Sequence, residues 1–183
     1  LKSKEALIRA YGVSLYEALF GTVLSMFLTM MFAYTLSRKE FVFKKFMILF
    51  ILITMLFSGG PVSSFIINSN VYGLRNNLLI LVIPGAVSVF DAIVMRTFIQ
   101  SNVPNELVEA ARIDGCTELG IFHRIILPLV KPALCLQIIF TFVTFWNNSF
   151  MHSLVLHDPK YKTIAMFLSI FTGSKGASGN PGI

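Results

Sequence analysis

The segment at residues 102–131 carries charged and small residues whose spacing could do chemistry at a protein interface. A carboxylate at Glu109 can pair with an arginine or lysine of another protein, and the small alanines that follow it permit a close approach. These residue types predict a docking element. The residues concerned are Glu106, Glu109, Ala110, Ala111, Asp114, Gly115, Ile125, Leu127 and Pro128.

A second set of polar residues lies inside long apolar segments. An ionisable group such as Asp91 in this setting is a functional candidate by default. The amides of Gln137, Asn147 and Asn148, together with the ring of Trp146, could hydrogen-bond to and stack on a sugar. Hydrogen bonds between helices and an interfacial tryptophan would explain the same residues, so both interpretations stay open. The histidines and the two cysteines form no metal-binding pattern, and no metal site is predicted.

The composition indicates that these residues are positioned by membrane-spanning helices. Apolar residues make up 55% of the 183 and charged residues only 13%, where a soluble domain has about 25% charged residues. A helix needs about 20 residues to cross roughly 30 Å of hydrocarbon, and backbone groups facing lipid must be paired within it. We therefore expect an all-α integral membrane protein with spans at about 15–36, 46–67, 78–99 and 133–151.

Basic residues between the spans predict the orientation. They gather between the first two spans and between the last two, as Arg38, Lys39, Lys44, Lys45, Arg112, Arg124 and Lys131. The positive-inside rule places both connections in the cytoplasm, and with them the loop at 102–131. Residues 152–183 are then external. This pattern explains the net charge of +6 without a nucleic-acid partner.

The chain is expected to be one transmembrane domain over residues 1–183, with further spans missing at both ends. It starts with Leu1 and has no leader pattern. The apolar piece near its end, about 164–171, is too short to span and runs into a Gly/Ser-rich stretch.

The loop at 102–131 contains signals for a hairpin of two short helices. Pro104 can occupy the first helical position, and Gly115 can adopt the left-handed conformation that ends a helix. Leu107, Ala110 and Ala111 should share one face. A second helix can start at Thr117 and stop before Pro128, with one face made by Leu119, Phe122, Ile125 and Ile126. An isolated Glu-Ala-Ala run would more simply be an amphipathic connector packed on its own spans.

The complete spacing resembles the coupling motif of the inner-membrane permeases of binding-protein-dependent ABC importers, which have the type I importer fold. Seven specified residues over twenty positions would coincide by chance at roughly 10⁻⁸ per start site. The likeness covers nearly the whole chain and extends to the carbohydrate-uptake branch, similar to the smaller maltose-transporter permease. Outside the loop, the matching positions include Arg96, Phe98, Pro132-Ala133, Ala33-Tyr34-x-Leu36-Ser37-Arg38, Trp146-Asn147 and Asp158-Pro159. Asp91 departs from it, because many members have asparagine there.

The resemblance implies a helical permease bundle in the bacterial inner membrane, with a cytoplasmic coupling hairpin and no enzymatic activity of its own. The 183 residues contain no G-x-x-x-x-G-K-[ST] segment to hold ATP phosphates. ATP and Mg are therefore expected in a separate ATPase dimer that docks on residues 104–127, and this chain itself should bind no cofactor. The resemblance also implies a second permease subunit and an external substrate-binding protein.

On this resemblance the cargo is a sugar or an oligosaccharide, and the possible translocation path contains Asp91, Gln137, Trp146, Asn147 and Asn148. Three alternatives stay open. The chain could serve an ABC importer for a non-sugar solute, or it could be an ion-coupled secondary transporter or channel that uses Asp91. It could also be a membrane assembly subunit with no pore of its own.

Overall fold

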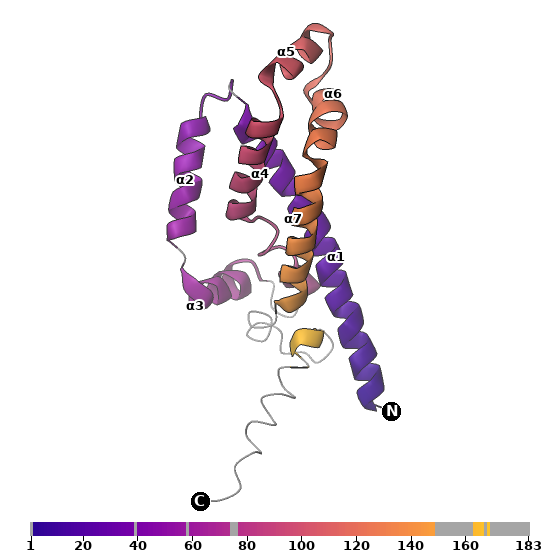
Figure 1. Cartoon of the computed structure of the whole chain (residues 1–183). Coiled ribbons are helices and arrows are strands. Elements are labelled where there is room, and N and C mark those ends of the chain that lie inside the picture. The colour runs from indigo at the N-terminus through magenta and orange to yellow at the C-terminus, as the bar shows by residue number, and fades with distance from the viewer. Residues whose placement is uncertain are drawn as a thin grey trace, which may run out of the picture. The chain divides into compact units, whose positions relative to one another are not determined.

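The computed structural model describes most of the chain, and the regular elements in that part are all helical (Figure 1). Helices are the expected solution for segments this apolar, because a helix pairs its backbone groups internally. The described residues are 2–38, 40–57, 59–73, 77–148, 163–166 and 168. The predicted external loop at 152–183 therefore lies almost entirely outside the described residues.

The chain divides into two compact units, and each unit is made of segments that are separated in the sequence. The first unit comprises residues 1–24, 59–86 and 141–183, and the second comprises residues 25–58 and 87–140.

The first unit is built around the N-terminal part of helix α1 (Lys2–Ser37) and the last turns of helix α7 (Leu127–Asn147). A short 3₁₀ turn, Leu78–Leu81, buries Ile80, Leu81 and Val82 against Val13 and Tyr16 of α1. On α1, a Cβ atom at Gly21 would lie 2.7 Å from the ring of Phe145. Glycine is thus required there for the close approach of that ring.

The second unit contains the C-terminal part of α1 with helices α2 (Lys44–Leu56), α4 (Val89–Asn102), α5 (Asn105–Ile113) and α6 (Glu118–Ile121), and most of α7. Its core is one cluster to which α1, α4, α5, α6 and α7 all contribute. The buried members are Met30, Ala33, Met95, Ile99, Val103, Val108, Ala111, Ile121, Ile126 and Val130.

Two helical stretches of the described chain are long and apolar enough to cross a membrane, Lys4–Ser37 and Glu118–Asn147. The first runs through the whole of the predicted span at 15–36. The second contains the predicted span at 133–151 as far as Asn147, while residues 149–151 lie outside the described residues.

The second predicted span, 46–67, is not one helix. Helix α2 ends at Leu56, and helix α3 (Gly60–Ile66) begins a separate element that continues into a π-helical turn, Ile67–Val71. Gly60, the first residue of α3, has a φ of +75°, which the interior of a continuous α-helix does not accommodate, and Pro61 has no N–H to continue the hydrogen bonds of α2. The interruption coincides with the break that Ser58-Gly59-Gly60-Pro61 makes in the apolar segment.

The third predicted span, 78–99, is also interrupted. Residues 82–88, which include Pro84 and Gly85, separate the 3₁₀ turn from α4. Helix α4 begins at Val89 because Ser88 caps it: the Ser88 hydroxyl accepts a hydrogen bond from the Asp91 backbone N–H at 3.3 Å. Asp91 thus lies in the first turn of a helix, where a carboxylate suits the helix dipole.

Candidate functional site

The predicted hairpin is present as α5 and α6, at the top of Figure 1. Helix α5 ends in a Schellman motif, because the Cys116 N–H donates to the Ala111 carbonyl at 2.9 Å and the Gly115 N–H to the Arg112 carbonyl at 3.0 Å. Gly115 has a φ of +78°, the left-handed conformation predicted for it. Pro104 precedes the helix as its N-cap residue instead of occupying the first helical position.

Helix α5 is strongly two-sided. Val108 and Ala111 are buried in the core of the second unit. The opposite side, which we call the exposed α5 face, presents carboxylates next to apolar side chains. It consists of Glu106, Leu107, Glu109, Ala110 and Ile113, the last 86% exposed.

The Glu-Ala-Ala run is therefore divided between two surfaces. Leu107, Ala110 and Ala111 were predicted to share one face, but Ala111 is 7% exposed whereas Ala110 lies on the exposed α5 face. The reason is that Val108 anchors the buried side, and Ala111, three residues later, falls beside it.

The second helix of the hairpin begins at the predicted position, and it differs from the prediction after Ile121. Thr117 caps α6 by accepting the Gly120 N–H at 3.2 Å, but α6 gives way at once to a π-helical turn, Phe122–Ile126. Leu119, predicted to share one face with Phe122, Ile125 and Ile126, is 70% exposed, whereas Ile121 is buried. The π-helical turn changes the register between the side chains before it and those after it, so Leu119 no longer lies on the face of Ile125 and Ile126.

The second helix was predicted to stop before Pro128, but the helical structure continues through this residue. The π-helical turn leads directly into α7, with Pro128 as its second residue. A proline is tolerated in a first helical turn because its missing N–H is not needed there. Ile125 and Leu127 are half-buried against the core of the second unit, while Asp114 and Pro128 are exposed.

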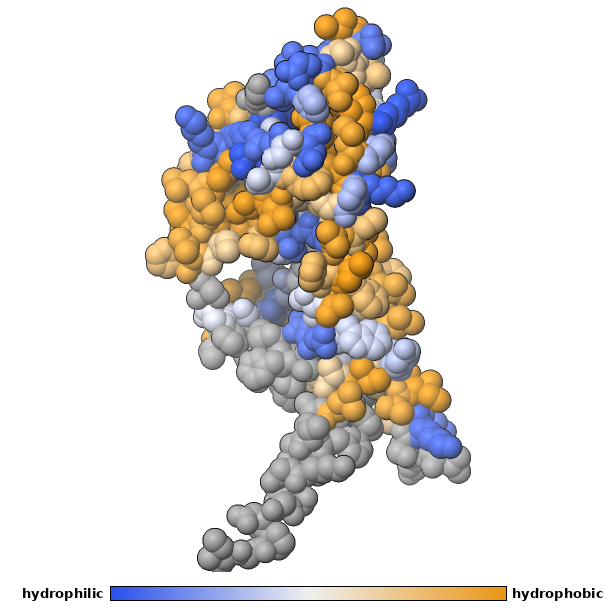
Figure 2. All heavy atoms as spheres, in the orientation of Figure 1, coloured by the Kyte–Doolittle hydropathy of each residue, from blue (hydrophilic) through white to orange (hydrophobic). Residues whose placement is uncertain are grey.

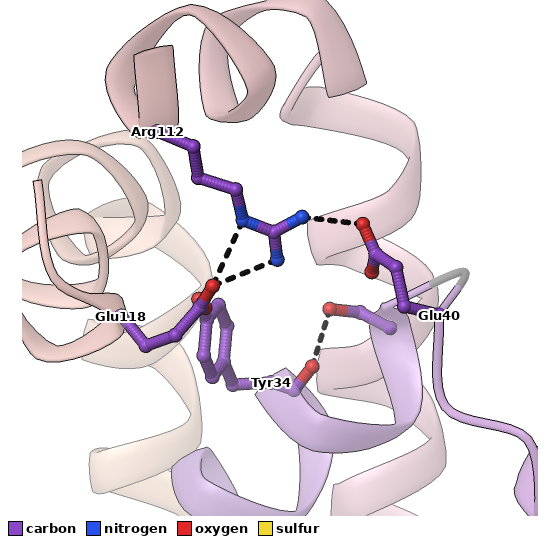
Figure 3. A network of polar contacts seen from close by, with 5 residues as sticks. Tyr34, Glu40, Arg112 and Glu118 are labelled. Atoms are coloured by element: carbon purple, nitrogen blue, oxygen red, sulfur yellow. Dashed lines mark hydrogen bonds and ion pairs between the residues drawn. The ribbon is translucent and has the colours of Figure 1, made fainter. Parts of the chain in front are cut away.

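Arg112 links the hairpin to the segment that follows α1 (Figure 3). Its guanidinium pairs with Glu40 at 2.5 Å and donates from Nε and Nη2 to Glu118 Oε1, at 2.8 Å in each case. Glu118 also accepts a hydrogen bond from the Tyr34 hydroxyl at 2.5 Å. We call Tyr34, Glu40, Arg112 and Glu118 the Arg112 network. It joins α1, the following segment, α5 and α6.

Aromatic and electrostatic contacts reinforce the Arg112 network. The Tyr34 ring packs edge-on against Phe122, with ring centroids 5.4 Å apart, and the Arg38 guanidinium lies 4.7 Å from its centroid. The hydrogen bond from Arg112 holds the pKa of Glu40 below its usual value. A charge-assisted contact of this kind favours the ionised carboxylate.

Helix α4 is tied to the end of α1 by side chains that cap α1's last carbonyls. Arg96 Nε donates to the Leu36 carbonyl at 3.1 Å, and Gln100 Nε2 donates to the Ser37 carbonyl at 3.2 Å. The last carbonyls of a helix have no partner within it, so these contacts complete the end of α1. The Arg112 network and these caps meet around the same helix end.

Two of the predicted path residues, Asp91 of α4 and Gln137 of α7, line one cavity of about 660 Å³ in the second unit. The other three belong to the end of α7. Trp146 contacts the rings of Tyr11 and Phe142, at centroid distances of 5.5 and 6.1 Å. The Asn147 amide donates to the Val143 carbonyl of its own helix at 2.9 Å, and the Asn148 backbone N–H donates to the Phe145 carbonyl.

The Arg112 network was missed at the sequence level. Arg112 and Glu118 lie six residues apart on different helices, and Glu40 is 72 residues away from Arg112. Only the Ser88-x-x-Asp91 pattern, a capping signal, could have shown in advance that Asp91 begins a helix. Within the described residues, no three His, Cys, Asp or Glu side chains gather as a metal site.

The surface around the hairpin is more hydrophilic than that of the helices beside it. Figure 2 shows hydrophilic side chains gathered over the α5–α6 hairpin and apolar ones covering α2. Large side chains such as Phe46, Phe50 and Ile53 of α2 are indeed exposed. This contrast separates a polar end from an apolar body, as expected where helices leave a bilayer.

Comparison with known proteins places the chain in a transport family. A family model described as "Binding-protein-dependent transport system inner membrane component" matches residues 12–177. The polygalacturonan/rhamnogalacturonan transport system permease protein YtcP of Bacillus subtilis is 35% identical over 97% of this chain and 62% of its own length. The maltodextrin transport system permease protein MdxG of the same organism is 32% identical over 88% of this chain and 59% of its own length.

A solved structure agrees with these relatives. It is a bacterial ABC transporter involved in the import of the acidic polysaccharide alginate, which matches 94% of this chain and 64% of the compared chain, with a TM-score of 0.84 and 26% identity. The chain spans about three fifths of the length of these relatives. The resemblance inferred from the spacing is thus confirmed: the chain belongs to the family of binding-protein-dependent transport system inner membrane components.

Proposed function

We propose that this chain is the membrane-spanning permease part of an ATP-driven importer that carries a sugar or oligosaccharide into the cytoplasm. The family match supports the transport role. The names of the similar proteins support the cargo class, since YtcP, MdxG and AraQ are named for polysaccharide, maltodextrin and arabinooligosaccharide transport.

The observation that carries the proposal is the exposed α5 face. Glu106 and Glu109 stand beside Leu107, Ala110 and Ile113 on a helix whose opposite side is locked into the core. Exposed apolar side chains rimmed by charges are typical of a protein interface. An ATPase with a basic-rimmed apolar cleft fits this face, with Glu109 as the charged contact.

Force applied to the hairpin can reach the helices because they share one core. Val108 and Ala111 of α5 pack in the same cluster as Met30 of α1, Met95 of α4 and Val130 of α7. Closely packed interiors transmit displacement with little compression. The hairpin and these helix ends would therefore move together when an ATPase dimer closes.

The remaining components follow from this division of labour. ATP and Mg would bind the partner ATPase, a second permease subunit would complete the pathway, and an external binding protein would deliver the cargo. The loop carrying Arg112 would face the cytoplasm, as the basic residues between the spans predict.

Exchanging the charge of Glu109 tests the docking assignment. Glu109→Lys should abolish uptake and co-purification of the ATPase while the protein still enters the membrane, because its exposed position makes it unnecessary for folding. The matched control is Arg124→Glu, which reverses an exposed charge in the π-helical turn outside the exposed α5 face. Full uptake by a stably assembled Glu109→Lys importer would disprove the assignment.

Dependence on ATP tests the wider proposal. Membrane vesicles that hold the complete importer should take up labelled oligosaccharide only when ATP is present inside. Uptake driven by a proton or sodium gradient alone would instead favour an ion-coupled carrier.

A further inference from the structure

The cavity between α4 and α7 is a groove of about 660 Å³, a size typical of small-molecule sites, which range over about 300–1,000 Å³. Most of its lining is apolar. We call it the α4–α7 groove, lined by Phe90, Asp91, Val94, Met95, Phe98, Pro132, Ala133, Leu136, Gln137 and Phe140.

Two polar side chains in this groove lack protein partners. Gln137 is only 8% exposed, and its amide makes no hydrogen bond to another residue of the described chain. The Asp91 carboxylate is likewise unpaired within the described residues, since Ser88 contacts only its backbone N–H. Gln137 is buried and Asp91 is half-buried in the lining of the groove, so both polar side chains are available to a ligand that enters it.

Aromatic rings supply the rest of the site. Phe90 and Phe98 of α4 and Phe140 of α7 line the same groove as the two polar groups, and Phe140 is 71% exposed. A phenyl face carries partial negative charge and therefore attracts the C–H groups on the flat side of a sugar ring. An amide, a carboxylate and aromatic rings around one groove match the hydroxyl edge and the apolar face of a sugar.

We propose that the α4–α7 groove binds a neutral sugar unit during import, and that Asp91 selects against sugars that carry a carboxylate. This inference rests on the proposed function and adds the cargo's charge class to it. A lipid chain or an apolar helix in the groove would leave Gln137 and Asp91 without partners, which is unfavourable. A sugar acid would place a second carboxylate near Asp91 in a site of low dielectric constant, where like charges repel strongly.

The proposed cargo differs in charge from the acidic polysaccharides named for the solved transporter and, as polygalacturonan, for YtcP. That transporter is described as importing an acidic polysaccharide. A carboxylate in the groove has the wrong sign for such a cargo. The hydroxyl-binding groups contributed by Gln137 and Asp91 suit an uncharged one.

The test uses the complete importer, purified in lipid nanodiscs without its external binding protein, so that only the membrane part can hold sugar. Maltotriose serves as the neutral probe and trigalacturonate as the acidic probe, and binding is measured by calorimetric titration. Co-purification of the ATPase is recorded for every sample, so a failure of the proposed function is seen separately from a failure of the groove.

Wild-type complex should bind maltotriose and should bind trigalacturonate much more weakly. Gln137→Leu and Phe140→Leu should each weaken maltotriose binding by about three- to tenfold, the loss of one modest contact. Asp91→Asn should keep maltotriose affinity within about threefold and raise trigalacturonate affinity at least about tenfold, because it removes the repulsion but keeps an acceptor.

Thr97→Val is the matched control, because Thr97 lies on α4 outside the groove lining and bonds only to its own helix at the Ile93 carbonyl. It should change neither affinity. If Gln137→Leu fails to assemble, Phe140→Leu, at an exposed position, decides the result. Absence of maltotriose binding, equal losses in Thr97→Val, or an unchanged probe preference in Asp91→Asn would overturn the proposal.

Discussion

Replacing Arg112 by methionine removes the central cation of the Arg112 network and keeps a side chain of similar length. The guanidinium is the group that joins Glu40, beyond the end of α1, to Glu118 on α6. Without it, two carboxylates remain near each other and the hairpin loses its polar attachment to α1. We expect the hairpin to stay folded and to transmit movement less well.

The size of the effect follows from exposure and packing. The side chains of Arg112, Glu40 and Glu118 are 33%, 59% and 55% exposed, and ion pairs at such positions contribute about 0.2–1 kcal/mol each after screening by solvent. Losing both pairs should destabilise the attachment by about 0.5–2 kcal/mol, an increase of about two- to thirtyfold in the detached population. Burial of the core side chains on the hairpin, at about 1.5–3 kcal/mol for a large one, is left intact.

Two measurements on the reconstituted importer test this expectation. Hydrogen exchange of the α5 amides should accelerate by the same two- to thirtyfold factor in Arg112→Met, about the ratio expected from the lost ion pairs. Proteoliposomes should consume more ATP for each sugar imported, while the ATPase still co-purifies. Raising the salt concentration should weaken the wild-type attachment in the same direction, since exposed pairs are screened.

Arg124→Met is the matched control, because Arg124 is an exposed cation in the π-helical turn of the same region and belongs to no ion pair in the described chain. Unchanged exchange and ATP consumption in Arg112→Met, or an equal loss in Arg124→Met, would refute the reasoning.

Three further outcomes are expected. Gly115→Ala should destabilise the hairpin by about 1–2 kcal/mol, seen as faster α5 exchange, because its φ of +78° is costly for any residue with a Cβ; equal stability would contradict a required left-handed turn. Ala111→Leu should lower the melting temperature of the complex, because overpacking a core costs about 1–3 kcal/mol. Ala110→Leu should leave that temperature unchanged and reduce ATPase co-purification, and the reverse order of effects would contradict the assigned faces. The contribution of the ionised Glu40 to the stability of the hairpin's attachment should be complete above the ordinary carboxyl pKa of about 4.3. It should be lost as the pH falls through the lowered pKa of Glu40 in the folded protein. In Glu40→Gln this acid-dependent rise in α5 exchange should shrink to the part contributed by Glu118, whose pKa is also lowered by its hydrogen bonds from Tyr34 and Arg112, and an unchanged rise would show that Glu40 makes no contribution.

Local signals in the sequence were sufficient for the hairpin. Gly115 follows Asp114 at the end of a helical pattern, and the structure has the left-handed turn there. The π-helical turn at Phe122–Ile126 could not be predicted in this way. It depends on which side chains the rest of the core accepts, and Leu119 is accordingly exposed instead of sharing the face of Ile125 and Ile126.

Hydropathy alone does not place the helix ends within the apolar segments. A window average counts Ser58-Gly59-Gly60-Pro61 and Pro84-Gly85 as neutral interruptions, whereas a helix ends wherever a positive φ or a missing N–H is required. The Ser88 cap then placed Asp91 in the first turn of α4. The backbone conformations of a few residues therefore decide where the helices end, and the hydropathy averaged over about twenty residues does not.

The sequence by itself determined that this chain is helical and membrane-spanning, with a two-helix hairpin whose spacing resembles that of the permease family, because charge content, apolar length and motif spacing are properties of the chain order. Only the tertiary structure decided which side of the hairpin is free and which groups share a site. Ala111 is buried and Ala110 is exposed because Ala111 lies on the same side of α5 as Val108, which packs in the core. Arg112 forms an ion pair with Glu40, and Asp91 and Gln137 line the same α4–α7 groove. Packing brings these residues together although no spacing rule connects them.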